Sequence, residues 1–112
     1  MPRETRGIVV EWSGEDLTIW SATQARTPVE FEYRTASSAE TSTRHLQPWG
    51  VVSFRARWYV VGLDVDRGAP RLFRLSRVQG QVKVTGKPGA YQVPEGTDIR
   101  ALTESLAPAP AE

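Results

Sequence analysis

The feature that most constrains the fold is a strand–turn–strand pattern in the middle of the chain. Residues 57–64 (RWYVVGLD) are rich in aromatic and β-branched side chains, as β-strands are. Residues 66–70 (DRGAP) are typical of a turn. Residues 71–78 (RLFRLSRV) then mix apolar residues with three arginines. The pattern predicts a β-hairpin whose return strand carries positive charge on a partly buried frame.

A helix is predicted before this hairpin. Ser13 is suited to be its N-cap, because Asp16, three residues later, can complete a capping box. The helix would then run over residues 14–25. We expect Leu17 and Trp20 to share the face that covers a sheet.

The remaining segments predict more strands. Residues 28–34 alternate between apolar and polar side chains, which predicts a strand with Tyr33 on its apolar face. Residues 35–43 are polar and predict a loop. Further strands are expected at 43–48, 49–54 and 81–84. These short strands indicate a mostly β fold, a small, strongly bent antiparallel barrel of about five strands with an N-terminal α-helix.

The length of 112 residues is that of one domain with a single modest core. We expect a tail or short strand over 1–12, the domain itself over 13–95, and a C-terminal tail over 96–112 in which a helix starts near Asp98. The chain has no cysteine, which excludes disulfides and Cys-based metal sites. It has neither an apolar run of membrane-spanning length nor a signal region, so we expect a cytoplasmic protein without membrane contact.

Charge is unevenly distributed, although the net charge is only +1. Residues 26–87 hold nine arginines and two lysines against five acids, whereas both ends of the chain are acidic. A basic centre favours an anionic partner. A solvated, arginine-rich surface without a partner explains the same distribution equally well.

Catalysis finds little support. The chain has one histidine and neither a Gly-x-Ser-x-Gly elbow nor a phosphate-binding loop. Asp64 and Asp66 have the chemistry of an acid–base pair, but such a pair in a hairpin is far more often part of the turn. His45 has no His or Cys partner at a metal-ligand spacing. We therefore predict no enzyme, no cofactor and no metal site.

Binding of an anion is better supported, because guanidinium forks match phosphates and aromatic faces stack on bases. The candidate binding residues are the basic and aromatic side chains on the predicted strands: Arg74, Arg77, Arg71, Arg34, Arg44, His45, Tyr33 and Tyr59.

Two questions about these candidates stay open at this stage. Strict strand alternation puts Arg71 and Arg77 on one face and Arg74 on the other, so a bulge or strong curvature is needed to bring them together. Trp58 is better explained as a core residue than as a stacking platform, and His45 is as well explained by a structural hydrogen bond as by a ligand contact.

Several segments, in the right order, resemble the WYL domain family. Residues 58–60 (WYV) lie where these domains have Trp-Tyr-Leu, with Val60 in place of Leu. Ser76 departs from the family, which usually has Asp there. The other matching segments are 31–34 (FEYR), 45–50 (HLQPWG), 62–64 (GLD) and 71–78 (RLFRLSRV). The resemblance covers roughly residues 14–95 and is strongest to the WYL regions of actinobacterial proteasome accessory factor B/C-type transcriptional regulators.

The resemblance implies an Sm-like, SH3-type barrel that acts as the ligand-sensing domain of a bacterial helix-turn-helix transcription regulator. Together with the basic centre, it implies an anionic effector, single-stranded nucleic acid or a nucleotide-like molecule, and a setting in the DNA damage response. The other expected partners are further domains of the same regulator and a second subunit, as a homodimer or a paired heterodimer.

The alternative is an assembly or dimerisation module without a ligand of its own. Its arginines would pair with Glu30, Glu32 or Asp64, and an apolar surface would meet another protomer. The sensor hypothesis instead requires Arg74 or Arg77 exposed in a concavity without a carboxylate partner.

Overall fold

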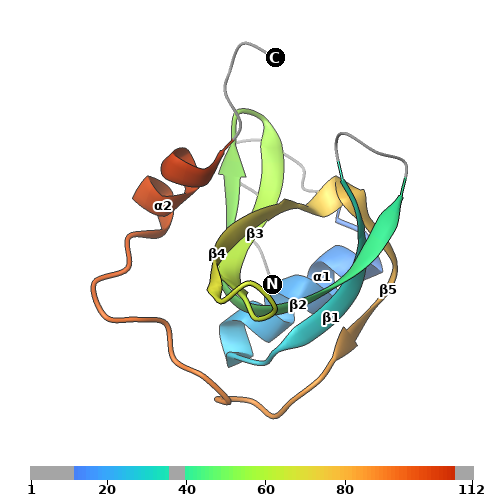
Figure 1. Cartoon of the computed structure of the whole chain (residues 1–112), viewed down its shortest axis with the longest axis horizontal. Coiled ribbons are helices and arrows are strands. Elements are labelled where there is room, and N and C mark those ends of the chain that lie inside the picture. Colours follow the sequence, from blue (N-terminus) through green and yellow to red (C-terminus); the bar gives the residue numbers. More distant parts are fainter. Residues whose placement is uncertain (1–11, 36–39, 108–112) are drawn as a thin grey trace.

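The computed structural model describes residues 12–35 and 40–107 (Figure 1). Five antiparallel strands form one sheet in the order β4-β3-β2-β1-β5. The predicted mostly β class with an N-terminal helix is therefore confirmed. The elements in chain order are α1 (Gly14–Ala25), β1 (Val29–Arg34), β2 (Thr41–Phe54), β3 (Arg57–Asp64), β4 (Ala69–Arg74), the 3-10 helix η1 (Leu75–Arg77), β5 (Val78–Val84) and α2 (Ile99–Leu106).

The sheet curls strongly but does not close. β4 and β5 are its two edge strands, and in the described part of the chain no backbone ladder joins them. The predicted barrel is therefore an open, bent sheet, and η1 spans the corner between its edges (Figure 1). A side chain bridges part of this gap: the Tyr33 hydroxyl of β1 accepts a hydrogen bond from the backbone N–H of Arg74 in β4, at 3.0 Å.

Helix α1 begins and ends where the sequence predicts. The Ser13 hydroxyl accepts from the backbone N–H of Asp16, and the Asp16 carboxylate accepts from the backbone N–H of Ser13, both at 3.1 Å. This capping box satisfies two donors that a helix N-terminus leaves free. At the other end Arg26 adopts a left-handed conformation, which terminates the helix.

The buried face of α1 differs from the predicted one. The helix packs on the sheet through small and medium side chains, and Leu17 is 43 % exposed. Trp20, the other residue of the predicted face, is half-buried. The buried residues of α1 are Ile19, Ala22 and Thr23.

The core fills the concave side of the bent sheet beneath α1. Phe31, Tyr33 and Phe73 form mutual edge-to-face pairs with ring centroids 4.9 to 6.2 Å apart. This geometry suits the charge distribution of aromatic rings. The aliphatic core residues around them include Ile19, Val29, Leu46, Val60, Leu75 and Val82.

Two predicted strands, 43–48 and 49–54, form the single long strand β2, which also takes in the end of the predicted loop. The register against β3 shifts between Pro48 and Gly50, so the proline is accommodated without ending the strand. Gly62 of β3 lies opposite this irregularity. A Cβ atom there would lie 2.2 Å from the carbonyl oxygen of Gln47, so the close approach of the two strands requires glycine.

The predicted return strand at 71–78 is also partly wrong. The strand starts two residues earlier, at Ala69, and ends at Arg74, where η1 turns the chain toward β5. β5 starts at Val78 rather than at residue 81. Pro70 is tolerated because β4 is an edge strand, where one side of the backbone needs no ladder partner.

Helix α2 lies beyond the sheet, where Asp98 caps it by accepting from the backbone N–H of Ala101. The side chain of Ile99 packs over Gly50 of β2, since a Cβ atom at that glycine would lie 3.1 Å from it. Neither helix of the described residues is long and apolar enough to cross a bilayer. The predicted N-terminal tail or strand lies, apart from Trp12, outside the described residues.

Candidate anion-binding pocket

A pocket of about 280 Å³ lies at the free edge of β4. We call it the arginine pocket. Five of the eight candidate binding residues line it, together with two leucines that the sequence analysis did not single out. The lining residues are Tyr33, Tyr59, Arg71, Leu72, Arg74, Arg77 and Leu106.

The three arginines meet in spite of their different strand parity. Arg71 and Arg74 point to opposite faces of β4, but the pocket lies beyond the edge of that strand, where side chains from both faces reach it. Arg77 also lines the pocket, because η1 ends the strand alternation after Arg74 and turns the chain back toward the pocket. The predicted need for a break in the strand is therefore met by a 3-10 turn rather than by a bulge.

The two tyrosines form a rigid wall. Tyr33 and Tyr59 are each only 8 % exposed, so their rings are held by the protein interior. Tyr59 pairs with Arg74 across the β3–β4 ladder. The Tyr33 hydroxyl accepts a hydrogen bond from the backbone N–H of Arg74 and so helps to hold that residue in place.

A buried carboxylate lies between two of the arginines. Asp64 is 1 % exposed, and its Oδ2 lies 3.9 Å from Nη1 of both Arg44 and Arg71. At this distance the charges attract, but no hydrogen bond forms. Asp64 Oδ2 and Arg71 Nη1 are both buried and have no hydrogen-bond partner in the described part of the chain. One negative charge thus serves two guanidinium groups.

The electrostatics around Arg71 favour an added anion. Burial, followed by the positive charges of Arg67 and Arg44, lowers the pKa of Arg71 below its ordinary value. The protein therefore solvates this guanidinium less well than water does. An anion in the pocket would offset part of that cost.

Arg74 and Arg77 have no carboxylate partner among the described residues. No acidic oxygen of the described residues lies within 4.0 Å of either guanidinium group. Both side chains lie in a concavity beside tyrosine rings. Both side chains are partly exposed, whereas the sensor hypothesis expects at least one of them to be exposed.

Arg44, a further candidate, adjoins the pocket without lining it. Its guanidinium lies over the rings of Tyr33 and Phe73, at 5.8 and 5.5 Å from their centroids. Arg34 is exposed at the end of β1 and does not line the pocket.

His45 lies on the other face of the sheet. It follows Arg44 in β2, and alternation sends the two side chains to opposite faces. Its Nδ1 is 2.8 Å from Asp66 and its Nε2 is 3.6 Å from Glu30. The hydrogen bond to Asp66, helped by nearby carboxylates, raises the pKa of His45 above 6.5. Asp64 and Asp66 thus belong to two separate charge clusters.

No group of three or more His, Cys, Asp or Glu side chains within residues 12–35 and 40–107 could hold a metal ion. Sequence reasoning missed Leu72 and Leu106, which form apolar walls of the pocket. Leu106 comes from α2, and only the folded chain shows that α2 lies beside β4.

Comparison with known proteins agrees with this architecture. The WYL domain profile matches residues 17–83. The chain belongs to the WYL domain family. This WYL domain is 43 % identical over 110 residues to Protein PafB of Mycobacterium leprae, a match that covers 90 % of this chain and 33 % of that protein. It is 44 % identical over 82 residues to Protein PafB of Mycobacterium tuberculosis, covering 73 % of this chain and 25 % of that protein.

A solved structure gives the same result. Proteasome accessory factor B/C (PafBC) of Arthrobacter aurescens superimposes on this WYL domain with a TM-score of 0.73 and 34 % identity, over 83 % of this chain and 14 % of that chain. The chain thus spans about a third or less of the length of these relatives.

Proposed function

We propose that this WYL domain is the sensor domain of a non-enzymatic bacterial transcription regulator of the PafB/PafBC type, and that an anionic effector binds in its arginine pocket. The effector is single-stranded nucleic acid or a nucleotide-like molecule. The single observation that supports this most is the position of Arg74 and Arg77 in a concavity walled by tyrosines, where neither guanidinium group has a carboxylate partner within residues 12–35 and 40–107.

The chemistry of the pocket fits a phosphate-bearing ligand. Guanidinium groups bind phosphate oxygens through paired, charge-assisted hydrogen bonds. Tyr33 and Tyr59 are held in place before a ligand arrives, which reduces the entropy lost on binding. Leu72 and Leu106 add apolar surface for the less polar part of the ligand.

We propose that a signal leaves the pocket through α2. Leu106 belongs to α2, so a ligand that contacts it favours one position of that helix over another. A ligand shifts an equilibrium only through such a difference in affinity. We propose that α2 passes the change to the parts of the regulator that follow it.

The assembly hypothesis retains two supporting observations. The first is that Arg44 and Arg71 lie near the Asp64 carboxylate, as that hypothesis expects. The second is an exposed apolar surface. Leu17 and Val84 are exposed and line a shallow apolar hollow between α1 and the end of β5. A second protomer could cover this surface without touching the arginine pocket, so assembly there is compatible with sensing.

The proposal is tested by fluorescence anisotropy of a labelled single-stranded oligonucleotide, titrated with the 112-residue chain at low and at moderate salt. We expect saturable binding that weakens steeply with salt. The variant Arg74→Ala plus Arg77→Ala should bind at least about tenfold more weakly. The control, Lys83→Ala plus Lys87→Ala, removes the same charge from exposed positions outside the pocket and should retain most of the affinity. Equal losses in both variants, or a flat titration at low salt, would contradict the proposal.

A further inference from the structure

A shallow hollow of about 370 Å³ lies between α1 and the end of β5. We call it the α1 hollow. Three large apolar side chains are exposed in the described part of the chain, and two of them, Leu17 and Val84, line this hollow at 43 % and 54 % exposure. The rest of its surface is formed by small side chains. The lining residues are Leu17, Thr18, Ser21, Ala22, Ala25, Thr27 and Val84.

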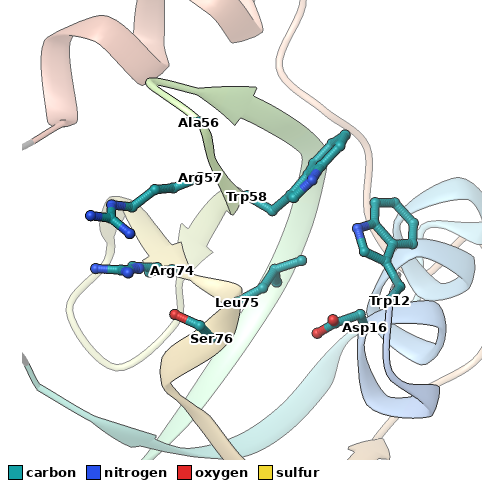
Figure 2. Close-up of a pocket in the computed structure, with 8 residues that line it drawn as sticks. All are labelled: Trp12, Asp16, Ala56, Arg57, Trp58, Arg74, Leu75 and Ser76. Atoms are coloured by element: carbon teal, nitrogen blue, oxygen red, sulfur yellow. The ribbon is translucent and has the colours of Figure 1, made fainter. Parts of the chain in front are cut away.

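The outer face of α1 carries no charged residue. The helix has only two charged residues, Glu15 and Asp16. Glu15 accepts a hydrogen bond from the backbone N–H of Val82 in β5, at 2.6 Å. Asp16 completes the capping box, and Figure 2 shows its side chain pointing toward η1. The exposed residues of the helix are Gly14, Leu17, Ser21, Gln24 and Ala25. A helix face that meets only water usually carries charged residues, so this face is better suited to contact with protein.

The α1 hollow is complementary in shape to itself. Leu17, Ser21 and Ala25 are four residues apart and form one row along the helix. The row starts with a large exposed side chain and ends with small ones that leave space for another. When two such helices pack antiparallel about a two-fold axis at Ser21, Leu17 of each lies opposite Ala25 of the other, because both residues are about one turn from the axis. The small side chains at the contact allow the helices to approach closely.

Charge favours the antiparallel arrangement over the parallel one. Glu15 and Asp16 lie in the first turn of α1, and Arg26 follows its last residue. Antiparallel packing places the acidic end of each helix near Arg26 of the other copy, and it also opposes the two helix dipoles. Parallel packing would bring like charges together at both ends of the pair.

We propose that the α1 hollow is the interface of a two-fold dimer of this chain, in which two α1 helices pack antiparallel and Leu17 of each fills the space beside Ala25 and Val84 of the other. The inference is independent of the proposed effector, because no residue of the α1 hollow lines the arginine pocket. The competing occupant is another domain of a longer regulator, which needs no self-complementary surface.

Analytical ultracentrifugation of the 112-residue chain, from micromolar to millimolar concentration, tests the association. The average mass of the wild type should rise reversibly from 12.5 kDa toward twice that value. Ser21→Arg places two like charges at the two-fold axis and should weaken dimerisation at least about tenfold. Ser105→Arg, the same change at an exposed position of α2 outside the hollow, should leave it unchanged.

Leu17→Ala tests the contact without adding a charge. It removes the apolar side chain that each copy contributes and should weaken dimerisation at least about fivefold. Ser21 and Leu17 are both exposed, so neither change should disturb the monomer. Thermal melting at low concentration checks this.

Cysteine cross-linking tests the geometry, because the chain has no cysteine of its own. Under mild oxidation Ser21→Cys should form a linked dimer at least about tenfold faster than Ser105→Cys, since only position 21 lies on the proposed axis. In a mixture of Thr18→Cys and Ala25→Cys chains, links between the two variants should form faster than links within either one. The reverse preference would show a parallel pair and contradict the proposal.

The remaining outcomes separate this inference from the proposed function. A wild-type chain that stays monomeric at millimolar concentration overturns the dimer and leaves the hollow to another domain. A dimer that Ser21→Arg and Leu17→Ala do not weaken has its interface elsewhere, which also overturns the inference. Neither result affects the arginine pocket, whose anion binding is measured with the Arg74 and Arg77 variants.

Discussion

Tyr33 is the residue that connects the core with the candidate site. Its ring packs against Phe31 and Phe73, and its hydroxyl accepts the backbone N–H of Arg74 at 3.0 Å. The loss of this hydroxyl leaves an edge N–H of β4 without its partner. The position of Arg74 therefore depends on a side chain from β1.

Tyr33→Phe should lower the free energy of unfolding by about 0.5–1.5 kcal/mol, as the loss of one hydrogen bond predicts. It should also weaken anion binding, because Arg74 is held less firmly. Urea denaturation and anisotropy measure the two effects. Tyr59→Phe is the control, since the Tyr59 hydroxyl makes no hydrogen bond within the described residues. The explanation fails if both variants lose the same stability.

The stability that His45 contributes should depend on pH, independently of the arginine pocket. Its hydrogen bond to Asp66 raises its pKa in the folded protein above the ordinary 6.5. A raised folded pKa contributes stability that is complete below the unfolded pKa and is lost as the pH rises through the folded pKa. NMR titration of the imidazole signals should show the raised pKa, and Asp66→Asn should move it back toward 6.5. An unchanged pKa in Asp66→Asn would show that Asp66 is not the cause.

At the scale of elements, the contact between β2 and β3 depends on one glycine. A Cβ atom at Gly62 would lie 2.2 Å from the Gln47 carbonyl oxygen and 2.8 Å from the Pro48 Cα. Both are backbone atoms, so the strands themselves must move apart. Gly62→Ala should therefore lower the free energy of unfolding by about 3 kcal/mol.

Chemical denaturation measures this loss. The matched control is Gly14→Ala at the start of α1, where a Cβ atom meets nothing within 4 Å. That change should leave the stability unchanged or raise it by up to about 1 kcal/mol. Similar losses at the two positions would contradict the steric explanation.

Asp64 joins three strands, because its carboxylate at the end of β3 lies near Arg44 of β2 and Arg71 of β4. Asp64→Asn leaves two guanidinium groups without a counter-charge, and we expect it to lower the free energy of unfolding by about 1–3 kcal/mol. The same change makes the arginine pocket more positive, so anion affinity should rise. Asp66→Asn removes the same charge from an exposed turn. It should change neither the free energy of unfolding nor the anion affinity strongly. A variant that loses stability and binds anions more weakly would contradict this role.

The elements that the sequence predicted well are those set by local chemistry. The capping box fixed the start of α1, and alternation identified β1. The run from Arg57 to Asp64 gave β3 to the residue. In each case neighbouring residues carry the signal.

The elements that the sequence predicted poorly are set by pairing between strands that lie far apart in the chain. Residues 75–77 contain neither Gly nor Pro, yet the chain turns there because β5 must reach β1. Pro48 was interpreted as the end of a strand, but a register shift against β3 accommodates it. The alternation of apolar and polar residues does not show that β5 pairs with β1 or that β2 pairs with β3.

At the scale of the whole molecule, the arginine pocket lies where the bent sheet stays open, between the β4 edge and α2. The arginines and tyrosines of this site could be named from the sequence, because the charge and aromatic character of a side chain do not depend on the strand bounds. Their convergence, the apolar walls, and the separation of His45 from the site depend on the fold. That part could not be predicted from one sequence.

The measurement that tests the central claim most directly is a ¹H–¹⁵N NMR titration of the 112-residue chain with a short single-stranded oligonucleotide at low salt. We predict saturable shifts that are largest for the amides of residues 71–77 and Tyr33 and for the guanidinium signals of Arg74 and Arg77, and that salt reverses. No saturable shift, or shifts confined to the hollow beside Leu17 and Val84, would contradict the assignment of this pocket as an anion site.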